Sequence, residues 1–372
     1  MLRPAAPTDD QLRAIASAFE VPWATRIVEP YGSGLINDTY RVEAGTKHYL
    51  LQRINTAVFP DPQRITANIQ ALSLHASRQQ SPGLRIPALI PTQGGQLSLR
   101  DTEGHVWRLM EFIEDAVTLA RIERPEQGLQ IGALLGRFHT LVQSLPPDAV
   151  GVSLPGFHDT PGYLARFMAI LPQAGRLRGD AEVEACIKLV MARRRIAARL
   201  AEAHAQGRIP LRVMHGDPKL DNILLGRADG HGLALIDLDT LQPGLILQDV
   251  GDCLRSCCNR SGESADGHSQ VSFDLALAEP ILNAYAQETR DWLTADEIDL
   301  IGEAIRLMPF ELGLRFLTDH LEGDRYFKVS ERGQNLDKAQ IQFALVQDIE
   351  KKAGEIRGLV DACFGRGEAP RP

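Results

Sequence analysis

Two short segments in the second half of the chain carry the residue types that phosphoryl transfer needs. Residues 213–222 read VMHGDPKLDN, which places a carboxylate, an ammonium group and an amide on one short loop. Residues 233–239 read LALIDLD, a hydrophobic strand that ends on two carboxylates. A phosphoryl transfer site has to orient and deprotonate an acceptor hydroxyl, bind Mg²⁺ through oxygen ligands and place positive charge near the moving phosphate. The two segments therefore predict a catalytic loop and a metal-binding strand end.

The pattern His-Gly-Asp-x-x-x-x-Asn followed by Ile-Asp resembles the catalytic loop and metal motif of the aminoglycoside phosphotransferase and choline kinase superfamily. Protein kinases use the related His-Arg-Asp and Asp-Phe-Gly motifs. The resemblance implies that Asp217 accepts the proton of the acceptor hydroxyl and that Asn222 and Asp237 hold Mg²⁺. It also implies that Lys219 neutralises charge on the transferred phosphate, and that Asp239 assists a second metal ion or orients the loop.

Two further residues are expected to support the catalytic loop rather than to react. His215 is expected to fix the loop by packing or by hydrogen bonding. Asp249 follows a Pro-Gly turn, and in the superfamily that this chain resembles an Asp after the metal motif braces the catalytic loop through backbone hydrogen bonds. The alternative for Asp249 is a helix N-cap, and the two roles are compatible.

A glycine-rich segment lies upstream, where a loop that covers the phosphates of ATP is expected. Residues 31–42 read YGSGLINDTYRV, and Gly32 and Gly34 would let the backbone approach phosphate oxygens. Asn37 replaces the third glycine of the protein-kinase pattern, as is usual in the small-molecule kinases that the chain resembles. Gly-x-Gly is also common in ordinary turns, but its place ahead of a predicted hairpin favours phosphate binding.

The next strand should carry a lysine for the nucleotide phosphates, yet residues 48–55 read HYLLQRIN. A simple alignment puts Gln52 at the lysine position, whereas chemistry favours the cation Arg53. Adjacent strand residues face opposite ways, so both cannot point at the nucleotide, and the sequence leaves the register open. Further along, backbone groups near Glu111 and Ile113 are expected to contact adenine, because residues 108–113 resemble a strand that enters a kinase hinge.

The elements that must position these residues fall into two groups. Strands are expected within residues 25–54 and 86–112, with a helix from Asp61-Pro62 to about residue 80 between them. That helix contains no Glu, so the usual Lys–Glu ion pair is absent or replaced, and a polar contact of Asn68 or Gln70 is one alternative. After residue 113, helical spacing dominates, including one long helix expected at residues 182–206.

The sequence therefore predicts an α+β protein with a two-lobed, protein-kinase-like fold, in which a small antiparallel β lobe precedes a larger, mainly helical lobe. The expected boundaries are residues 1–112 for the nucleotide-binding lobe, 113–364 for the catalytic and acceptor-binding lobe, and 365–372 for a disordered tail.

Composition narrows the functional classes. The 372 residues carry a net charge of −8, which argues against a dedicated nucleic-acid binder. The chain shows neither a secretory signal nor an apolar run long enough for a membrane span, so a cytoplasmic protein is expected. Its 5 cysteines lack framework spacing, and Cys253, Cys257 and Cys258 are expected to be small buried helix residues rather than a metal cluster.

Several short motifs resemble one branch of the superfamily, the N-acetylhexosamine 1-kinases. They lie at residues 31–39, 51–59, 236–244, 251–255, 315–319 and 324–327. This resemblance implies transfer of the γ-phosphate of ATP to the anomeric hydroxyl of N-acetylglucosamine or N-acetylgalactosamine, with Mg²⁺ as cofactor and a sugar as the small-molecule partner. The residues that could supply the hydroxyl contacts and the wall of a sugar site are Asp38, Arg315, Asp319 and Tyr326.

Other functions remain open at this point. Aminoglycoside, choline or homoserine are alternative acceptors, and a cationic acceptor would need an acidic site that Asp252, Asp319, Glu322 and Asp324 could form. Choline sites also favour aromatic cages, and the sequence shows no clear one. A nucleotide-binding pseudokinase that serves as a partner module is a further alternative, although the complete catalytic set argues against it. Whether the chain is a monomer or a homodimer is open.

Overall fold

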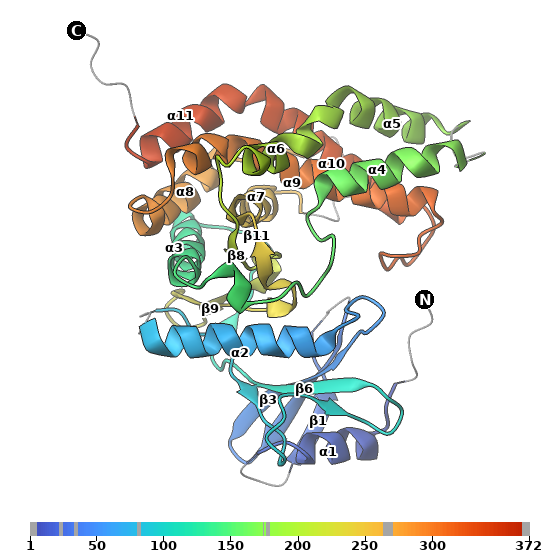
Figure 1. The fold of residues 1–372 in the computed structure, drawn as a ribbon, viewed down its shortest axis with the longest axis vertical. Coiled ribbons are helices and arrows are strands. Elements are labelled where there is room, and N and C mark those ends of the chain that lie inside the picture. Colours follow the sequence, from blue (N-terminus) through green and yellow to red (C-terminus); the bar gives the residue numbers. More distant parts are fainter. Residues whose placement is uncertain are drawn as a thin grey trace.

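The computed structural model describes residues 6–21, 25–32, 36–79, 83–173, 175, 179–262 and 271–366. These residues fold into a small lobe built on a β-sheet and a larger, mainly helical lobe (Figure 1). The two-lobed α+β fold predicted from the sequence is confirmed. No described helix is both long enough and apolar enough to cross a membrane.

The small lobe is a six-stranded antiparallel sheet in the order β1-β2-β3-β6-β4, with β5 paired to β6. Its elements are α1 (Asp9–Ser17), β1 (Thr25–Pro30), β2 (Asp38–Ala44), β3 (Lys47–Ile54), α2 (Pro62–Gln79), β4 (Leu89–Ile90), β5 (Leu99–Arg100) and β6 (Val106–Glu111). The β2–β3 hairpin turns at Gly45, whose φ of 67° suits a glycine. The register of β3 and β6 then places Gln52 opposite Arg108, and Arg53 opposite Trp107.

The two faces of this sheet pack against different parts of the chain. Trp107 belongs to a small-lobe core that also contains the apolar side of α1. Ile54 belongs instead to the large core, together with α2 and the large lobe. Because side chains alternate along a strand, Gln52 and Arg108 lie on the face of the sheet toward α2 and the large lobe, whereas Arg53 lies on the α1 face.

Helix α2 lies between the sheet and the large lobe (Figure 1). It begins directly after Asp61 with a proline in its first turn, as expected. Asn68 on this helix donates to the carbonyl oxygens of Leu241 (2.8 Å) and Gly151 (2.7 Å), and accepts from the Gly151 N–H. The polar contact of Asn68 therefore fixes α2 to the large lobe, and does not replace an ion pair within the small lobe.

The large lobe consists of helices around two small sheets. Its helices are α3 (Pro125–Val142), α4 (Thr160–Ile170), α5 (Ala181–Arg193), α6 (Arg199–Ala205), α7 (Ile246–Cys257), α8 (Leu275–Thr289), α9 (Ala295–Leu321), α10 (Gln334–Lys351) and α11 (Ala353–Cys363). Its strands are β7 (Ala116–Val117), β8 (Arg212–Met214), β9 (Ile223–Gly226), β10 (Gly232–Leu235) and β11 (Gln242–Gly244). The sheets are β10-β9-β7 and β11-β8, and both border the catalytic segments.

Two sequence expectations for this lobe have structural outcomes. The single helix expected at residues 182–206 is instead split into α5 and α6 by a 3₁₀ segment, Arg194–Ala198. The tighter turn buries Ile196 and Ala197, and the 3₁₀ segment packs against α9. The cysteines are free thiols, and Cys253, Cys257 and Cys258 are buried as expected. Of the expected tail, residues 367–372 lie outside the described chain.

Candidate active site

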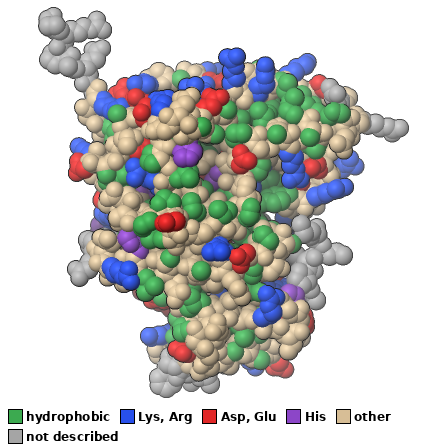
Figure 2. All heavy atoms as spheres, in the orientation of Figure 1, with side chains coloured by type: hydrophobic (Ala, Val, Ile, Leu, Met, Phe, Trp, Pro, Cys, Tyr) green, Lys and Arg blue, Asp and Glu red, His purple; other side chains and the backbone are tan. Residues whose placement is uncertain are grey.

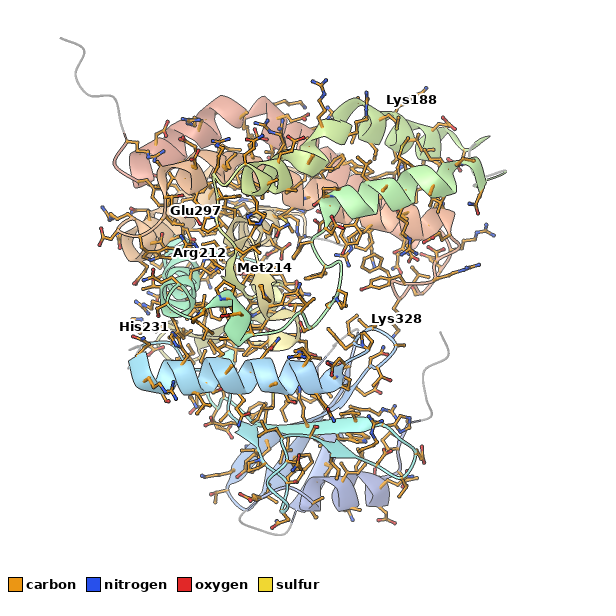
Figure 3. All side chains as sticks on the ribbon, viewed as in Figure 1. Lys188, Arg212, Met214, His231, Glu297 and Lys328 are labelled. Atoms are coloured by element: carbon orange, nitrogen blue, oxygen red, sulfur yellow. The ribbon has the colours of Figure 1, made fainter. Side chains whose placement is uncertain are left out.

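The catalytic loop leaves strand β8, which is anchored to helix α9. Arg212 on β8 pairs with Glu297 near the start of α9, at 2.9 Å (Figure 3). The loop turns at Gly216, whose φ is 90°. A Cβ atom there would lie 2.8 Å from the backbone oxygen of Thr240, so both the conformation and the lack of space require glycine. This turn delivers Asp217 at the end of the strand.

Asp249 on α7 braces the loop from behind. Its carboxylate accepts hydrogen bonds from the backbone N–H groups of His215 (2.7 Å) and Gly216 (2.8 Å). The ring of His139 lies 3.1 Å from the same carboxylate. Burial alone would raise the pKa of Asp249, but the hydrogen bond from His139 and its charge hold that pKa below its ordinary value. The N-cap of α7 is Leu245, so Asp249 braces the loop and is no N-cap.

His215 connects the catalytic loop to residues 236–239, the predicted metal-binding segment. Its Nε2 lies 3.0 Å from the carbonyl oxygen of Ile236, and its Nδ1 accepts a hydrogen bond from the Asp217 N–H at 3.2 Å. Burial lowers the pKa of His215, which keeps the ring neutral. A neutral ring with one donor and one acceptor fits these two contacts, and the expected structural part for this residue agrees with them.

The loop brings three of the predicted residues together. Lys219 Nζ donates to Asp217 Oδ2 at 2.6 Å, and Asn222 Nδ2 donates to the same oxygen at 3.0 Å. Asn222 Nδ2 also donates to the backbone oxygen of Asp217 at 2.8 Å. The amide nitrogen of Asn222 is thus used by Asp217, which leaves the amide oxygen to act as a ligand.

Asp237 follows β10 in a strained backbone conformation beside Asn222. The Ile236 N–H donates to the Asn222 carbonyl at 2.9 Å, and Asp237 itself has φ 63°, which is uncommon for a residue other than glycine. Burial raises the pKa of Asp237 to about 7, and the charges of Asp239 and Asp217 add to this effect. Such a carboxylate, crowded by the charges of Asp239 and Asp217, fits a hard divalent cation, which would favour the ionised form.

Asp239 is held from the small lobe. Its two carboxylate oxygens accept from Arg108 Nη2 (2.5 Å) and Asn37 Nδ2 (2.7 Å). Asn37 also accepts the Asn55 N–H at 2.9 Å. The structure therefore places the Asn37 side chain between β3 and Asp239, where it ties the glycine-rich segment to the metal-binding segment.

The structure answers the register question on β3. Gln52 accepts two hydrogen bonds from Arg108, at 3.0 and 2.7 Å, on the face toward the large lobe. Arg53 instead pairs with Asp38 at 2.6 Å and lies over the ring of Trp107, on the α1 face. Gln52 therefore occupies the position expected for lysine, and Arg53 and Asp38 are not brought to the residues around Asp217.

The other residues predicted to hold the nucleotide belong to the glycine-rich segment, to the end of β6 and to the residues after it. Gly32 has φ 73° with no atom near the position of a Cβ, as in an open turn, and Gly34 lies outside the described residues. The Glu111 N–H donates to the Ala88 oxygen at 2.8 Å, so the residue before β4 uses that donor. No described residue accepts from the Ile113 N–H, which leaves it for a ligand.

An arginine among aromatic rings lies near the catalytic loop. The Arg315 guanidinium is 5.0 to 5.8 Å from the ring centres of Phe157, Tyr163, Tyr326 and Phe327. The residue after Phe157, His158, contacts the catalytic loop at Gly216. Arg315 and Tyr326 are thus brought together, on one side of the loop that carries Asp217. Tyr326 belongs to the α9–α10 connection, on which Lys328 is labelled in Figure 3.

Asp319 has a different environment. Its carboxylate accepts from the backbone N–H groups of Arg325, Tyr326 and Phe327 at 2.7 to 2.9 Å, and from Asn335 Nδ2 at 3.0 Å. These donors occupy both oxygens. Asp319 therefore orders the segment that carries Tyr326, and any direct contact with an acceptor stays a prediction.

A buried imidazole, which sequence reasoning missed, holds the catalytic loop. His158 Nε2 lies 2.6 Å from the Gly216 oxygen, and Nδ1 lies 2.7 Å from Glu311 Oε1 on α9. A carbonyl and a carboxylate are both acceptors, so both ring nitrogens donate and the imidazole is charged. Burial would lower the pKa of His158, but the charge of Glu311 and its hydrogen bond raise it to about 8.

Arg108 was also missed as a site residue. Read along the sequence, it is one residue of a buried strand. The only local signal is a positive charge inside the hydrophobic run of residues 106–113, which is unusual for a strand with buried faces.

Fold and site together define an ATP-dependent small-molecule kinase, in which a small β-sheet lobe precedes a loop that carries Asp217, Lys219 and Asn222. The sequence model of the phosphotransferase enzyme family, APH, matches residues 27–294. The chain belongs to this family.

Solved structures show the same fold at low sequence identity. The microcompartment-associated aminopropanol kinase is 18% identical, with a TM-score of 0.65, over 93% of this chain and 98% of that chain. An aminoglycoside phosphotransferase from Alicyclobacillus acidocaldarius subsp. acidocaldarius DSM 446 is 18% identical, with a TM-score of 0.63, over 97% and 98%. Spectinomycin phosphotransferase, in complex with ADP and spectinomycin, is 13% identical, with a TM-score of 0.60, over 94% and 100%.

Proposed function

We propose that this kinase uses ATP and Mg²⁺ to phosphorylate the anomeric hydroxyl of an N-acetylhexosamine, N-acetylglucosamine or N-acetylgalactosamine, to give the sugar 1-phosphate. The observation that carries the acceptor class is the charge beside the catalytic loop. Arg315 lies there among aromatic rings. A neutral acceptor with many hydroxyl groups suits that environment better than a cation does.

Most of the acidic oxygens that could have held a cationic acceptor already have partners. Glu322 pairs with Arg166 at 2.6 Å, and Asp252 pairs with Arg255 at 2.7 Å. Asp324 accepts a hydrogen bond from Asn335 at 2.8 Å. An ammonium acceptor would therefore approach the Arg315 guanidinium without an excess of carboxylates to offset the repulsion.

The same side chains offer the contacts that an acetamido sugar needs. A guanidinium carries several N–H donors for hydroxyl and carbonyl oxygens, and the ring of Tyr326 gives an apolar wall. The Oδ2 atom of Asp252 is buried and has no hydrogen-bond donor among the described residues, so a hydroxyl could supply one. We assign Arg315 and Tyr326 to the acceptor. Asp319 acts through the Tyr326 segment, and Asp38, which pairs with Arg53, is not assigned to the acceptor.

In the proposed reaction, the acceptor oxygen forms a bond to the γ-phosphorus of ATP while the bond from that phosphorus to the β,γ-bridging oxygen breaks. The hydroxyl proton passes to Asp217, and ADP leaves. Lys219 places positive charge beside the transferred group. Asn222 and Asp237 would hold Mg²⁺, which supplies charge neutralisation on the phosphates. Gly32, Gly34 and the hinge groups at Glu111 and Ile113 would hold the nucleotide against the lobe of residues 1–112.

A coupled ADP-release assay with a defined acceptor panel tests this proposal. The panel contains both N-acetylhexosamines, glucose, choline, homoserine and an aminoglycoside, each with Mg²⁺-ATP. The methyl glycoside of N-acetylglucosamine, whose anomeric oxygen is blocked, is the matched control. We expect turnover of an N-acetylhexosamine, no turnover of its methyl glycoside, and a 1-phosphate product by ³¹P NMR. Turnover of choline, homoserine or an aminoglycoside in place of the sugars would contradict the proposed acceptor and leave the kinase assignment intact.

A further inference from the structure

The small lobe carries its buried positive charge on an unexpected strand. On β3, the residue that faces the large lobe at the lysine position is the neutral Gln52. Directly opposite it on β6 stands Arg108, whose side chain is 1% exposed. The two side chains share one face of the sheet, and the guanidinium reaches Asp239, two residues beyond Asp237.

The contacts of Arg108 use only part of its guanidinium. Nε and Nη2 donate to Gln52, and Nη2 also donates to Asp239. The Nη1 atom is buried and has no hydrogen-bond acceptor among the described residues. A charged N–H group that is buried without an acceptor is strongly unfavourable, so native structures supply a partner, which can be a protein group, an ordered water or a bound ion.

An anion bound near Asp239 would satisfy both the charge and the unused donor of Arg108. The guanidinium lies against Asp239, and its charge also acts on Asp237. It is therefore close to the position that a metal-bound phosphate would take. A nucleotide triphosphate is the anion that the proposed function brings to this place. Arginine holds phosphate through several N–H donors in a fixed plane and keeps its charge when buried.

We propose that Arg108 is the small-lobe phosphate cation of this kinase, with Nη1 donating to a phosphate oxygen of ATP while Nη2 holds Asp239. The inference rests on the proposed nucleotide site between the glycine-rich segment and Asp237. The positive charge lies on β6, at the position that faces Gln52 on β3, and Gln52 orients the guanidinium. The same guanidinium thereby connects the nucleotide to the segment that carries the metal ligand.

The register makes a charge-relocation experiment available. We compare the wild-type chain with R108M, with R108K and with the double variant Q52K/R108M, in which a lysine on β3 replaces the lost charge. The control is R100M, because Arg100 is an exposed arginine on the neighbouring strand β5 and donates to the Gly104 oxygen. Isothermal titration with Mg²⁺-ATP and with adenosine, together with the KM for ATP and for the acceptor, gives the readouts.

We expect R108M to bind ATP about tenfold to hundredfold more weakly, the range for loss of one charge-assisted hydrogen bond. Adenosine binding should stay unchanged, because adenosine has no phosphate. R108K should be intermediate, and Q52K/R108M should recover at least about tenfold of the lost ATP affinity. R100M should bind ATP as the wild type does.

Three outcomes would overturn the assignment. Equal ATP affinity of R108M and wild type would show that Arg108 does not reach the phosphates. Equal loss of ATP and adenosine binding would show that it acts only on the shape of the site. A Q52K/R108M variant that melts like the wild type but recovers no ATP affinity would show that Arg108 acts through Asp239 alone. If the wild-type chain binds no ATP at all, the proposed function itself fails.

Discussion

At the scale of single residues, the groups around Asp217 determine whether this site performs phosphoryl transfer. Asp217 is held by Lys219 and Asn222 in one short loop, whose backbone Asp249 fixes. We expect D217N to lower kcat by about 10²- to 10⁴-fold, because an amide cannot accept the acceptor proton as a general base. The KM for ATP should change little. Initial-rate kinetics with Mg²⁺-ATP and the preferred acceptor measure both quantities.

A neighbouring acidic residue provides the control for that substitution. Asp221 is exposed and lies in the same loop, so D221N removes the same charge without removing the proposed base. D221N should retain most of the wild-type kcat. A D217N variant with undiminished kcat would remove Asp217 from the part of base, whatever happens to ATP binding.

His158 gives the loop a pH dependence. Burial would lower the pKa of His158, but Glu311 raises it to about 8, above the ordinary value of 6.5. The charged imidazole therefore contributes stability that is complete below pH 6.5 and is lost as the pH rises through about 8, a contribution of roughly 2 kcal/mol. Because the ring donates to the Gly216 oxygen, we expect kcat to fall along the same limb. The dependence of kcat and of the melting temperature on pH, measured between about pH 6 and 9.5, tests both expectations.

The groups around His158 supply the variants. Glu311 faces it from α9, and Asp252 acts on it from α7, while Thr160 donates to Glu311 and Gln248 donates to the His158 backbone oxygen. H158Q should lose the limb near pH 8, and E311Q should move that limb to lower pH because the raising charge is gone. A limb that persists unchanged in H158Q would mean that another group causes it.

At the scale of elements, the packing of α7 against α9 positions Asp249 and Asp252. Gly251 lies at the closest approach, where a Cβ would be 2.4 Å from the Ala304 backbone oxygen of α9. G251A should therefore force the helices apart, destabilise the fold by about 1–3 kcal/mol and lower kcat through the displaced brace. Chemical denaturation and initial rates are the measurements.

A second helical glycine is the matched control for this packing argument. Gly302 lies on α9, and a Cβ there would meet only Ile356, at 3.9 Å. G302A should be neutral or stabilising, by up to about 1 kcal/mol, since alanine favours a helix more than glycine does. Equal effects of G251A and G302A would show that helix propensity, and not close approach, determines the outcome.

The elements also show how far the sequence could be interpreted. The catalytic loop, the metal-binding segment and the strands around the glycine-rich segment are local patterns, so residue types at short spacing were enough to locate them. Arg108 and His158 act through contacts with Asp239 and Gly216, which are distant in the sequence. Strand register and helix packing create such contacts, and a single sequence does not specify them. Asp319 illustrates the converse. Its residue type suited a substrate ligand, but backbone N–H groups close to it in the sequence occupy its carboxylate.

At the scale of the whole molecule, the two lobes are joined next to the metal-binding segment. Arg108 and Asn37 hold Asp239 from the small lobe, and Asn68 on α2 donates to Leu241. Both connections therefore end on residues 239–241. Lobe position and the geometry around Asp237 are consequently coupled through one short segment.

Charged side chains of both signs are interspersed over the face drawn in Figure 2, so neither sign dominates that face.

This coupling should make the stability of the whole chain depend on Mg²⁺ and on pH together. Burial, with the charges of Asp239 and Asp217, raises the pKa of Asp237 to about 7, above the ordinary value of 3.8. Without a metal, the folded chain therefore holds a proton that it loses as the pH rises through about 7, and stability falls with it. Mg²⁺ favours the ionised carboxylate, so Mg²⁺-ATP should raise the melting temperature more at pH 8 than at pH 6. Scanning fluorimetry with Mg²⁺-ATP or with EDTA measures this difference, and D237N should lose both the slope and the Mg²⁺ effect. If Mg²⁺-ATP raises the melting temperature by the same amount at pH 6 and at pH 8, Asp237 does not bind the metal.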